Sequence, residues 1–247
     1  MSGVLEVFRD PPLDGPTNMA RDEHLLYREV ISPAALRVYA WEPPTISLGY
    51  FQRCEQLDAL PADVRDLAVV RRVTGGGAIL HDREVTYCLV LADGLPIAAR
   101  SPDALYRLVH ACWRDVLLRE GTSCELAPDE YPMPTPRTGP FFCFQKPGRT
   151  DLVIGEEKLL GSAQRRIAGR VLQHGSLLLG RRFVSHPGVD LGEPPADVVD
   201  AWVGAFIADL AAELGLVVRL EDWTEEQLAD VERRRERYAN AAWTRRR

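Results

Sequence analysis

Short strand-like segments follow one another through much of the chain, often with no helix between them, and this pattern constrains the fold most. Leu36–Trp41 alternates in the manner of a strand. Further strands are expected at Val4–Phe8, Thr45–Tyr50, Leu67–Arg71, Val85–Leu91, Phe141–Phe144, Asp151–Ile154, Lys158–Arg166, Arg170–Leu179 and Leu216–Leu220. Regular strand–helix alternation is missing, so the pattern predicts an α+β fold with a mixed, largely antiparallel sheet.

Helical patterns flank these strands. The first runs from Thr17, its expected cap, to about Ile31, with the acids Asp22 and Glu23 near its start. The others are Ser101–Gly121, Ala196–Leu214 with Gly215 as its stop, and a last helix after the capping box of Thr224 and Gln227. There is no repeat and no long linker, so we expect one domain over residues 1–247, with no C-terminal accessory domain.

Composition excludes several classes of protein. Apolar residues make up 46% of the 247 and charged residues 27%, as in ordinary globular chains. The longest apolar stretch, near Tyr87–Ala92, is far below the ~20 residues that cross a bilayer, and the first ten residues hold no signal core. Five cysteines are few and odd in number, which favours the cytoplasm. A net charge of −6 argues against nucleic acid as a partner.

Lysine is rare in this chain. Only Lys146 and Lys158 occur among 30 basic residues, and both lie within residues 143–166, close to Cys143. Base composition of the genome explains most of such a bias. A retained lysine is nevertheless a candidate for chemistry that needs a compact ammonium group, which arginine cannot supply. We therefore single out Lys158.

A glycine-rich turn lies in the motif RRVTGGGAILHD, Arg71–Asp82. Gly75, Gly76 and Gly77 leave no side chain between the backbone and a ligand, and Arg71 and Arg72 can hold an anion. The motif lacks the features of a P-loop or a dinucleotide fingerprint, and a plain tight turn is the alternative. We expect Gly76→Ala to obstruct ligand binding more than folding. His81 and Asp82 have no second ligand cluster, so no metal site is expected.

A second motif spans CFQKPGRTDLVIGEEKLLGSAQRR, Cys143–Arg166. Cys143 follows the proline-rich stretch Ala127–Pro140, which has the composition of a lid or binding loop. Lys146–Arg182 holds eight basic and three acidic residues, which suits an anionic substrate such as a phosphate-bearing carrier. Nearby cations favour a thiolate, so Lys146, Arg149 and Lys158 make Cys143 a candidate nucleophile. Buried, inert thiols are expected at the other cysteines, Cys54, Cys88, Cys112 and Cys124.

Four blocks in order give the chain a resemblance to the lipoate–protein ligase and octanoyltransferase family. They are Asn18–Glu23, Leu36–Gln52, Arg71–Asp82, and the segments DLVIGEEKLLGSAQRR and VLQHGSLLL. The resemblance implies a fold shared with biotin ligases and class II aminoacyl-tRNA synthetases. It also implies that Lys158 contacts an acyl carbonyl. The implied substrate-binding residues are Arg72, Gly75, Gly76, Gly77, His81, Ser162, Ala163, His174 and Gly175, although a lone histidine in a strand is more often a hydrogen-bonded core residue.

The position of Cys143, 15 residues before Lys158, resembles that of the nucleophilic cysteine in cysteine-dependent octanoyltransferases. This implies transfer of an octanoyl or lipoyl group from acyl carrier protein to a lysine of a lipoyl-domain protein, such as the glycine-cleavage H protein. No cofactor and no membrane partner are then expected. Two alternatives stay open. One is a lipoate–protein ligase, which would use ATP and Mg²⁺ through an acyl-adenylate. The other is a non-catalytic paralogue that binds acyl groups or a carrier.

Overall fold

An eight-stranded sheet forms the centre of the protein, in a computed structural model that describes residues 3–29, 32–132 and 139–246. Its strand order is β11-β1-β2-β6-β10-β9-β8-β7. The strands are β1 (Gly3–Arg9), β2 (Ala34–Tyr39), β6 (Glu84–Leu91), β7 (Glu125–Leu126), β8 (Leu152–Ile154), β9 (Glu157–Ile167), β10 (Arg170–Leu178) and β11 (Leu216–Leu220). β1 pairs in parallel with β2 and β11, and every other neighbouring pair is antiparallel. The predicted mixed, largely antiparallel sheet is confirmed.

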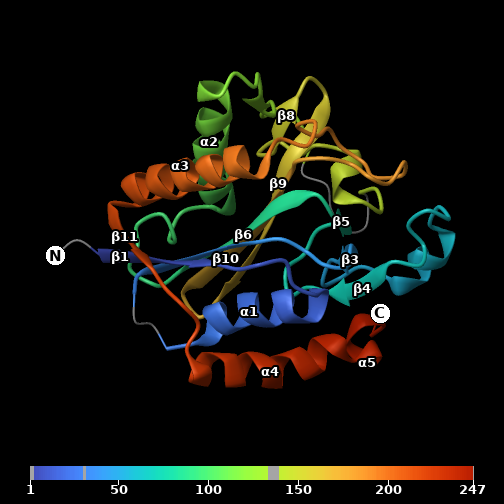
Figure 1. Ribbon diagram of the computed structural model, residues 1–247, viewed down its shortest axis with the longest axis horizontal. Helices are drawn as coiled ribbons and strands as arrows, with labels where there is room; N and C mark the ends of the chain where they lie inside the picture. Colours follow the sequence, from blue (N-terminus) through green and yellow to red (C-terminus); the bar gives the residue numbers. More distant parts are fainter. Residues whose placement is uncertain (1–2, 30–31, 133–138, 247) are drawn as a thin grey trace.

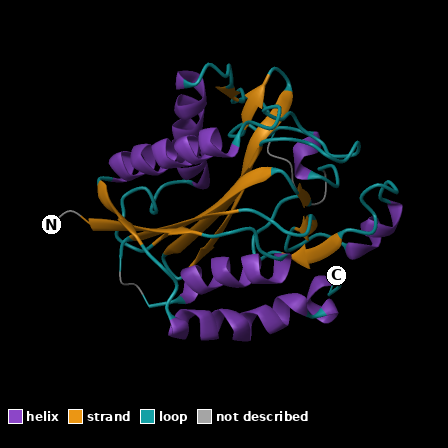
Figure 2. Ribbon diagram, in the orientation of Figure 1, coloured by secondary structure: helices purple, strands orange, loops and turns teal. Residues whose placement is uncertain are grey.

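Helices cover both faces of this sheet (Figures 1 and 2). One face carries α2 (Pro102–Arg119) and α3 (Ala196–Leu214), and the other carries α1 (Gly15–Tyr27) and α4 (Glu225–Ala239). All eight residues of β6 are buried, because one set of alternate side chains packs under α2 and α3 and the other under α1. Tyr87 and Leu89 belong to the first core, and Cys88 and Val90 to the second.

A small three-stranded sheet lies beside the large one and carries the glycine-rich turn. Its order is β4-β3-β5, with β3 (Thr45–Leu48) parallel to β4 (Ala68–Arg71) and antiparallel to β5 (Ile79–His81). The turn connects β4 to β5. Both ends of the turn are therefore anchored on β3, which fixes the position of Gly75–Gly77.

Local signals located most helix ends correctly. Gly215 ends α3 in the left-handed conformation with φ +66°, and Thr224 and Gln227 form the expected capping box of α4. The predicted cap of α1 was wrong. Asp14 is the N-cap and accepts a hydrogen bond from the Thr17 N–H, so Thr17 already lies inside the helix.

Several short elements escaped the sequence patterns, namely β5, β7, the 3-10 helices η1 (Cys54–Ala59) and η2 (Cys143–Gln145), and α5 (Ala241–Thr244). The part of the proline-rich stretch at residues 133–138 lies outside the described residues, as do residues 30 and 31 near the expected end of the first helix. Among the described helices, none combines the length and apolar character needed to cross a membrane.

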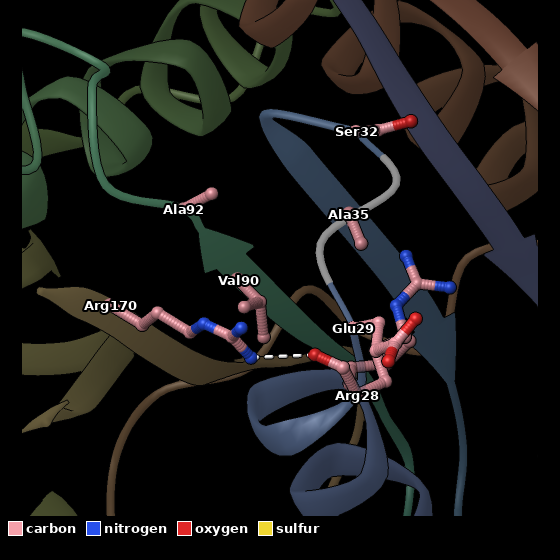
Figure 3. Close-up of a pocket in the computed structure, with 8 residues that line it drawn as sticks. Arg28, Glu29, Ser32, Ala35, Val90, Ala92 and Arg170 are labelled. Atoms are coloured by element: carbon pink, nitrogen blue, oxygen red, sulfur yellow. Dashed lines mark hydrogen bonds between the residues drawn. The ribbon is translucent and has the colours of Figure 1, made fainter. Parts of the chain in front are cut away.

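A hollow of about 20 Å³ beside the end of α1 has a structural explanation (Figure 3). Arg170, from β10, donates hydrogen bonds to the carbonyls of Leu26 (2.9 Å) and Arg28 (2.6 Å). The last carbonyls of a helix have no partner within it, and a guanidinium group satisfies them. The space holds little more than one water molecule, so we assign this hollow to helix capping.

Candidate active site

A cavity of about 180 Å³ collects residues from four separate parts of the chain. Its described lining comprises the glycine turn, part of α2, the segment around Cys143 and the middle of β9: Gly75, Gly76, Gly77, Tyr106, Gly139, Pro140, Cys143, Gly148, Thr150, Asp151, Lys158, Ser162, Ala163 and Gln164. Seven of the eleven residues predicted for the site therefore face one cavity.

Lys158 is buried in the cavity wall at the start of β9, with its side chain 3% exposed. Its Nζ lies 2.7 Å from Asp151 Oδ2 and donates a hydrogen bond to Cys143 Sγ at 3.2 Å. Burial alone would lower the pKa of Lys158, but Asp151 and Cys143 outweigh burial and raise that pKa above its ordinary value. The group is therefore a fixed ammonium ion directed at the sulfur.

Asp151 was not predicted as a site residue. It immediately precedes β8, and its Oδ2 accepts a hydrogen bond from the Gly148 N–H at 2.7 Å. The Asp151 N–H in turn donates to the Gly148 carbonyl at 3.0 Å, which closes a tight turn. The sequence does show an acidic residue between a glycine and an apolar strand, which suggests a turn. It does not show that this residue pairs with Lys158. The turn holds the carboxylate on Lys158.

Cys143 lies at the start of η2 and is half-buried. The prediction of a strand at Phe141–Phe144 was wrong, because the chain makes only one isolated bridge, between Phe142 and Ala78, before it turns into η2. The Ala78 N–H donates to the Phe141 carbonyl and the Cys143 N–H donates to the Ala78 carbonyl, both at 2.8 Å. This bridge attaches Cys143 to the end of the glycine turn.

Of the three cations expected near Cys143, the structure brings Lys158 to the sulfur. Arg149 pairs with Asp103 at 2.7 Å, and Lys146 is exposed. Lys158 therefore supplies a buried positive charge in direct contact with Cys143, and the buried Arg72 guanidinium interacts electrostatically with the same residue.

Arg71 and Arg72 both donate hydrogen bonds to backbone carbonyl groups. Arg72 is buried, donates to the carbonyls of Gly75 and Gly77 at 2.7 Å each, and donates through Nη1 to the Ser47 carbonyl at 2.8 Å. Burial lowers its pKa to about 10, so it stays charged at neutral pH. Arg71 donates to the carbonyls of Gly49 and Gln52. In this structure the Arg72 guanidinium shapes the glycine turn, and the Arg71 guanidinium holds the backbone at Gly49 and Gln52.

The structure predicts that Gly76→Ala will also impair folding, whereas the sequence suggested an effect mainly on ligand binding. Gly76 has φ +91°, and an added Cβ would lie 3.1 Å from Arg72 Nη2. We therefore expect Gly76→Ala to cost about 1–2 kcal/mol of folding free energy, because an L side chain is strained at that φ. Gly75→Ala is the matched control, since its Cβ would meet only Phe51 Cδ2, at 4.0 Å. Thermal unfolding should show a fall in Tm for Gly76→Ala alone; equal Tm values would contradict this.

Gly161 provides a test of the ammonium position. A Cβ at Gly161 would lie 2.0 Å from Lys158 Cε and 2.3 Å from Nζ, so Gly161→Ala must push the side chain off its place. A misplaced catalytic group costs roughly a hundredfold in rate. We expect Gly161→Ala to fold and to lose about that factor in turnover. Gly204→Ala, in α3 with open space around its Cβ, should keep full turnover. Unchanged turnover in Gly161→Ala would contradict the contact between Lys158 and an acyl carbonyl that the family resemblance implies.

The four remaining predicted residues lie in the next layer, around a hollow of about 10 Å³: Arg72, His81, His174 and Gly175. The His81 ring is stacked on Trp41 at 3.8 Å and bonded to Ser47 and Glu84, at 2.7 Å each.

His174 is held from both sides. Its Nδ1 lies 3.0 Å from Asp22 Oδ2, and its Nε2 lies 2.6 Å from Thr74 Oγ1. Thr74 also accepts from Arg72 Nε at 3.1 Å. Asp22 lies in the middle of α1, not near its start as expected, and it begins a buried chain of contacts that ends at the glycine turn.

The other cysteines are set apart from the cavity. Burial raises the pKa of Cys112 to about 12 and that of Cys124 to about 11, and it also raises the pKa of Cys88 well above its ordinary value. These three thiols stay protonated in the core, as expected. Cys54 departs from the expectation because it is only half-buried, in η1.

Known proteins share this sequence and this fold. Residues 14–184 match the lipoyl protein ligase A/B catalytic domain. The chain is 42% identical over 169 residues to octanoyltransferase LipM from Moorella thermoacetica and 40% identical to that from Kyrpidia tusciae, covering 67% and 66% of this chain. These matches span 62% and 61% of the relatives' own length.

Solved structures agree in fold at low identity. A putative lipoate protein ligase from Thermoplasma acidophilum with bound lipoic acid superposes with a TM-score of 0.77 at 19% identity, over 100% of both chains. Lipoate-protein ligase A bound with ATP gives a TM-score of 0.74 at 20% identity, over 99% of both chains. With its family match covering most of its length and a fold shared from end to end, this chain belongs to the lipoyl protein ligase A/B catalytic domain family.

Proposed function

We propose that this protein transfers an octanoyl or lipoyl group to a lysine of a lipoyl-domain protein through a thioester on Cys143. The observation that carries the proposal is the 3.2 Å contact between Lys158 Nζ and Cys143 Sγ at the wall of a cavity. A fixed ammonium ion beside sulfur favours the thiolate, which is the nucleophilic form. Relatives named octanoyltransferase at 42% and 40% identity support the same reaction.

The reaction has two balanced steps. The Cys143 thiolate attacks the carbonyl carbon of the donor thioester, a new C–S bond forms, the donor's C–S bond breaks, and the released donor thiolate takes up a proton. The acceptor amine then attacks the acyl-enzyme carbonyl carbon. The C–N bond forms and the bond from that carbon to Sγ breaks. The nitrogen loses one proton, which the released sulfur of Cys143 takes up. Two easier steps replace one hard step, which is the gain of covalent catalysis.

Lys158 and the glycine turn act on the same oxygen in this proposal. Each attack places negative charge on the acyl carbonyl oxygen, and donors fixed beside that oxygen are worth roughly 10²–10³ in rate apiece. Arg72 engages the carbonyls of Gly75 and Gly77, which supports a turn whose N–H groups face the acyl group. Asp151 keeps the ammonium in place at 2.7 Å. Ala163 gives a small wall against which an acyl chain can lie.

Acyl carrier protein is the proposed donor, and a lipoyl-domain protein such as the glycine-cleavage H protein is the proposed acceptor. A solved relative in fold is described together with its E2 lipoyl domain, in an archaeal lipoylation system. Donor and acyl-enzyme are both thioesters and similar in energy, so the proposed reaction needs no ATP.

The test is incubation with octanoyl-acyl carrier protein in the absence of ATP. We expect intact-mass spectrometry to show one added octanoyl group, removable by hydroxylamine and located on the peptide that holds Cys143. ATP–pyrophosphate exchange with octanoate or lipoate is measured alongside. Exchange that depends on the free acid, with no acyl-enzyme from the carrier, would replace this proposal with an ATP-dependent ligase.

A further inference from the structure

A buried histidine outside the predicted site contacts the cavity wall. His110, in α2, is fully buried, and its Nδ1 is hydrogen-bonded to the carbonyl of Thr150. A carbonyl only accepts, so Nδ1 carries the proton. Burial lowers the pKa of His110 to about 4, so the ring is neutral and Nε2 is an acceptor. Ser162 Oγ lies 2.6 Å from that Nε2, so the Ser162 hydroxyl must donate to it.

A second chain of hydrogen bonds, from Gln164 through Gln173 and Tyr87, reaches Ser162 and is consistent with the same direction of donation. Gln164 Nε2 donates to the Pro102 carbonyl at 2.9 Å, and Gln164 Oε1 accepts from Arg166, which fixes how the amide is turned. Gln164 Nε2 also donates to Gln173 Oε1 at 2.8 Å, so Gln173 presents its Nε2 to the Tyr87 hydroxyl, at 2.8 Å. The Tyr87 hydroxyl accepts there, which leaves its own proton available, and because Ser162 has already given its one proton to His110, Tyr87 must be the donor to Ser162.

Ser162 receives that proton. Tyr87 Oη lies 2.6 Å from Ser162 Oγ, so Ser162 accepts from Tyr87 and donates to His110. A hydroxyl has one proton and two lone pairs, and these contacts use the proton and one lone pair. Within the described ranges, the Ser162 side chain makes no further hydrogen bond, and it lines the cavity that holds Cys143 and Lys158. What Ser162 still offers to a ligand is an acceptor.

A hydrogen-bond acceptor at Ser162 can bind only one of the two reacting groups. The acyl carbonyl oxygen only accepts hydrogen bonds, so it gains nothing from Ser162. The attacking nitrogen of the acceptor lysine carries N–H donors. We propose that Ser162 is the site in the cavity wall that binds an N–H of the incoming lysine amine, and that His110 is the positioning residue, because it accepts the Ser162 proton and so leaves a lone pair for the amine. This inference rests on the proposed function.

The two half-reactions separate this role from a role in acylation. Octanoyl-enzyme is formed from octanoyl-acyl carrier protein, isolated, and mixed in a single turnover with a lipoyl-domain protein. We expect Ser162→Ala to form octanoyl-enzyme at close to the wild-type rate. Its transfer to the lysine should slow by roughly tenfold to a hundredfold, because the attacking nitrogen gains positive charge as the C–N bond forms and a hydrogen bond to a charged group is worth about that factor.

Tyr87→Phe is the matched control, because it removes a hydroxyl from the same network but leaves the Ser162 acceptor and its bond to His110. We expect Tyr87→Phe to lower Tm at least as much as Ser162→Ala and to slow transfer to lysine by less than about threefold. The difference in transfer rate between the two variants measures the effect of the Ser162 acceptor, apart from any effect of weaker packing in the cavity wall.

Two results would overturn the inference. One is transfer to lysine at the wild-type rate by the octanoyl-enzyme of Ser162→Ala. The other is an equal loss in both half-reactions, which would assign Ser162 to the acyl group or to the structure of the wall. Failure of the wild-type protein to form octanoyl-enzyme is a distinct result, which overturns the proposed function and this inference with it.

Discussion

Replacement of Cys143 by serine is expected to abolish formation of the acyl-enzyme and to reduce transfer by more than about a thousandfold. Loss of a nucleophile costs most of the rate that the catalytic group supplies, and a hydroxyl has too high a pKa to be ionised by one ammonium ion. Intact-mass spectrometry after incubation with octanoyl-acyl carrier protein should show no hydroxylamine-sensitive adduct on Cys143→Ser. Its Tm should stay close to that of the parent protein, since the side chain keeps its size.

The four other cysteines provide the controls for this experiment. Cys54→Ser, at the half-buried position in η1, should keep both the adduct and the transfer rate. Cys88, Cys112 and Cys124 are core residues, so alanine there should reduce stability and leave the chemistry of the folded fraction intact. Full activity in Cys143→Ala, together with a requirement for ATP, would show that the reaction proceeds without a cysteine thioester.

Replacement of Lys158 has the second largest expected effect, and it acts on rate and on stability. Lys158→Ala should lose roughly 10²–10³ in the rate of acylation, because the donor to the developing oxyanion is removed. It also leaves the Asp151 carboxylate, with its side chain 9% exposed, without its cation. Breaking a buried ion pair from one side costs about 3–5 kcal/mol. Urea unfolding and single-turnover acylation measure the two effects separately.

Two variants separate these effects. Lys158→Met combined with Asp151→Asn removes both charges, so it should recover most of the stability while activity stays lost. Lys158→Arg keeps the charge but brings a planar, bulkier group against Gly161, and should also lose most activity. Lys146→Arg, at the exposed second lysine, is the matched control and should behave as the parent protein. Near-normal acylation by a folded Lys158→Arg would refute the proposed role.

Local sequence signals predicted the long elements because each of those signals acts over one or two turns of chain. The left-handed Gly215 and the Thr224–Gln227 capping box are complete within four residues, so no distant partner is needed to recognise them. β5 has only three residues and exists because it pairs with β3, which lies more than 30 residues away in the chain. Such a strand carries too little pattern of its own to be predicted.

The residues of the candidate site also divide into those recognisable from local sequence and those that depend on distant partners. Cys143, Lys158 and Gly75–Gly77 were recognisable because their residue types are rare here or chemically distinct, and because the order of the motifs resembles a known family. Asp151 and His110 were not recognised, since their roles depend on partners that only the fold brings near. His110 contacts Thr150 and Ser162, 40 and 52 positions away. In sequence it is one polar residue among apolar ones on a helix.

The bridge between Ala78 and the Phe141–Cys143 segment has a consequence for hydrogen exchange. The amide protons of Ala78 and Cys143 are each held by the other segment, at 2.8 Å. An opening motion that frees one of these amides must separate the two segments and therefore also frees the other. The two amides should exchange with solvent at a common rate, and a group bound on the sulfur should slow both together. The glycine turn and the nucleophile thus form one cooperative opening unit, although more than 60 residues of chain separate them.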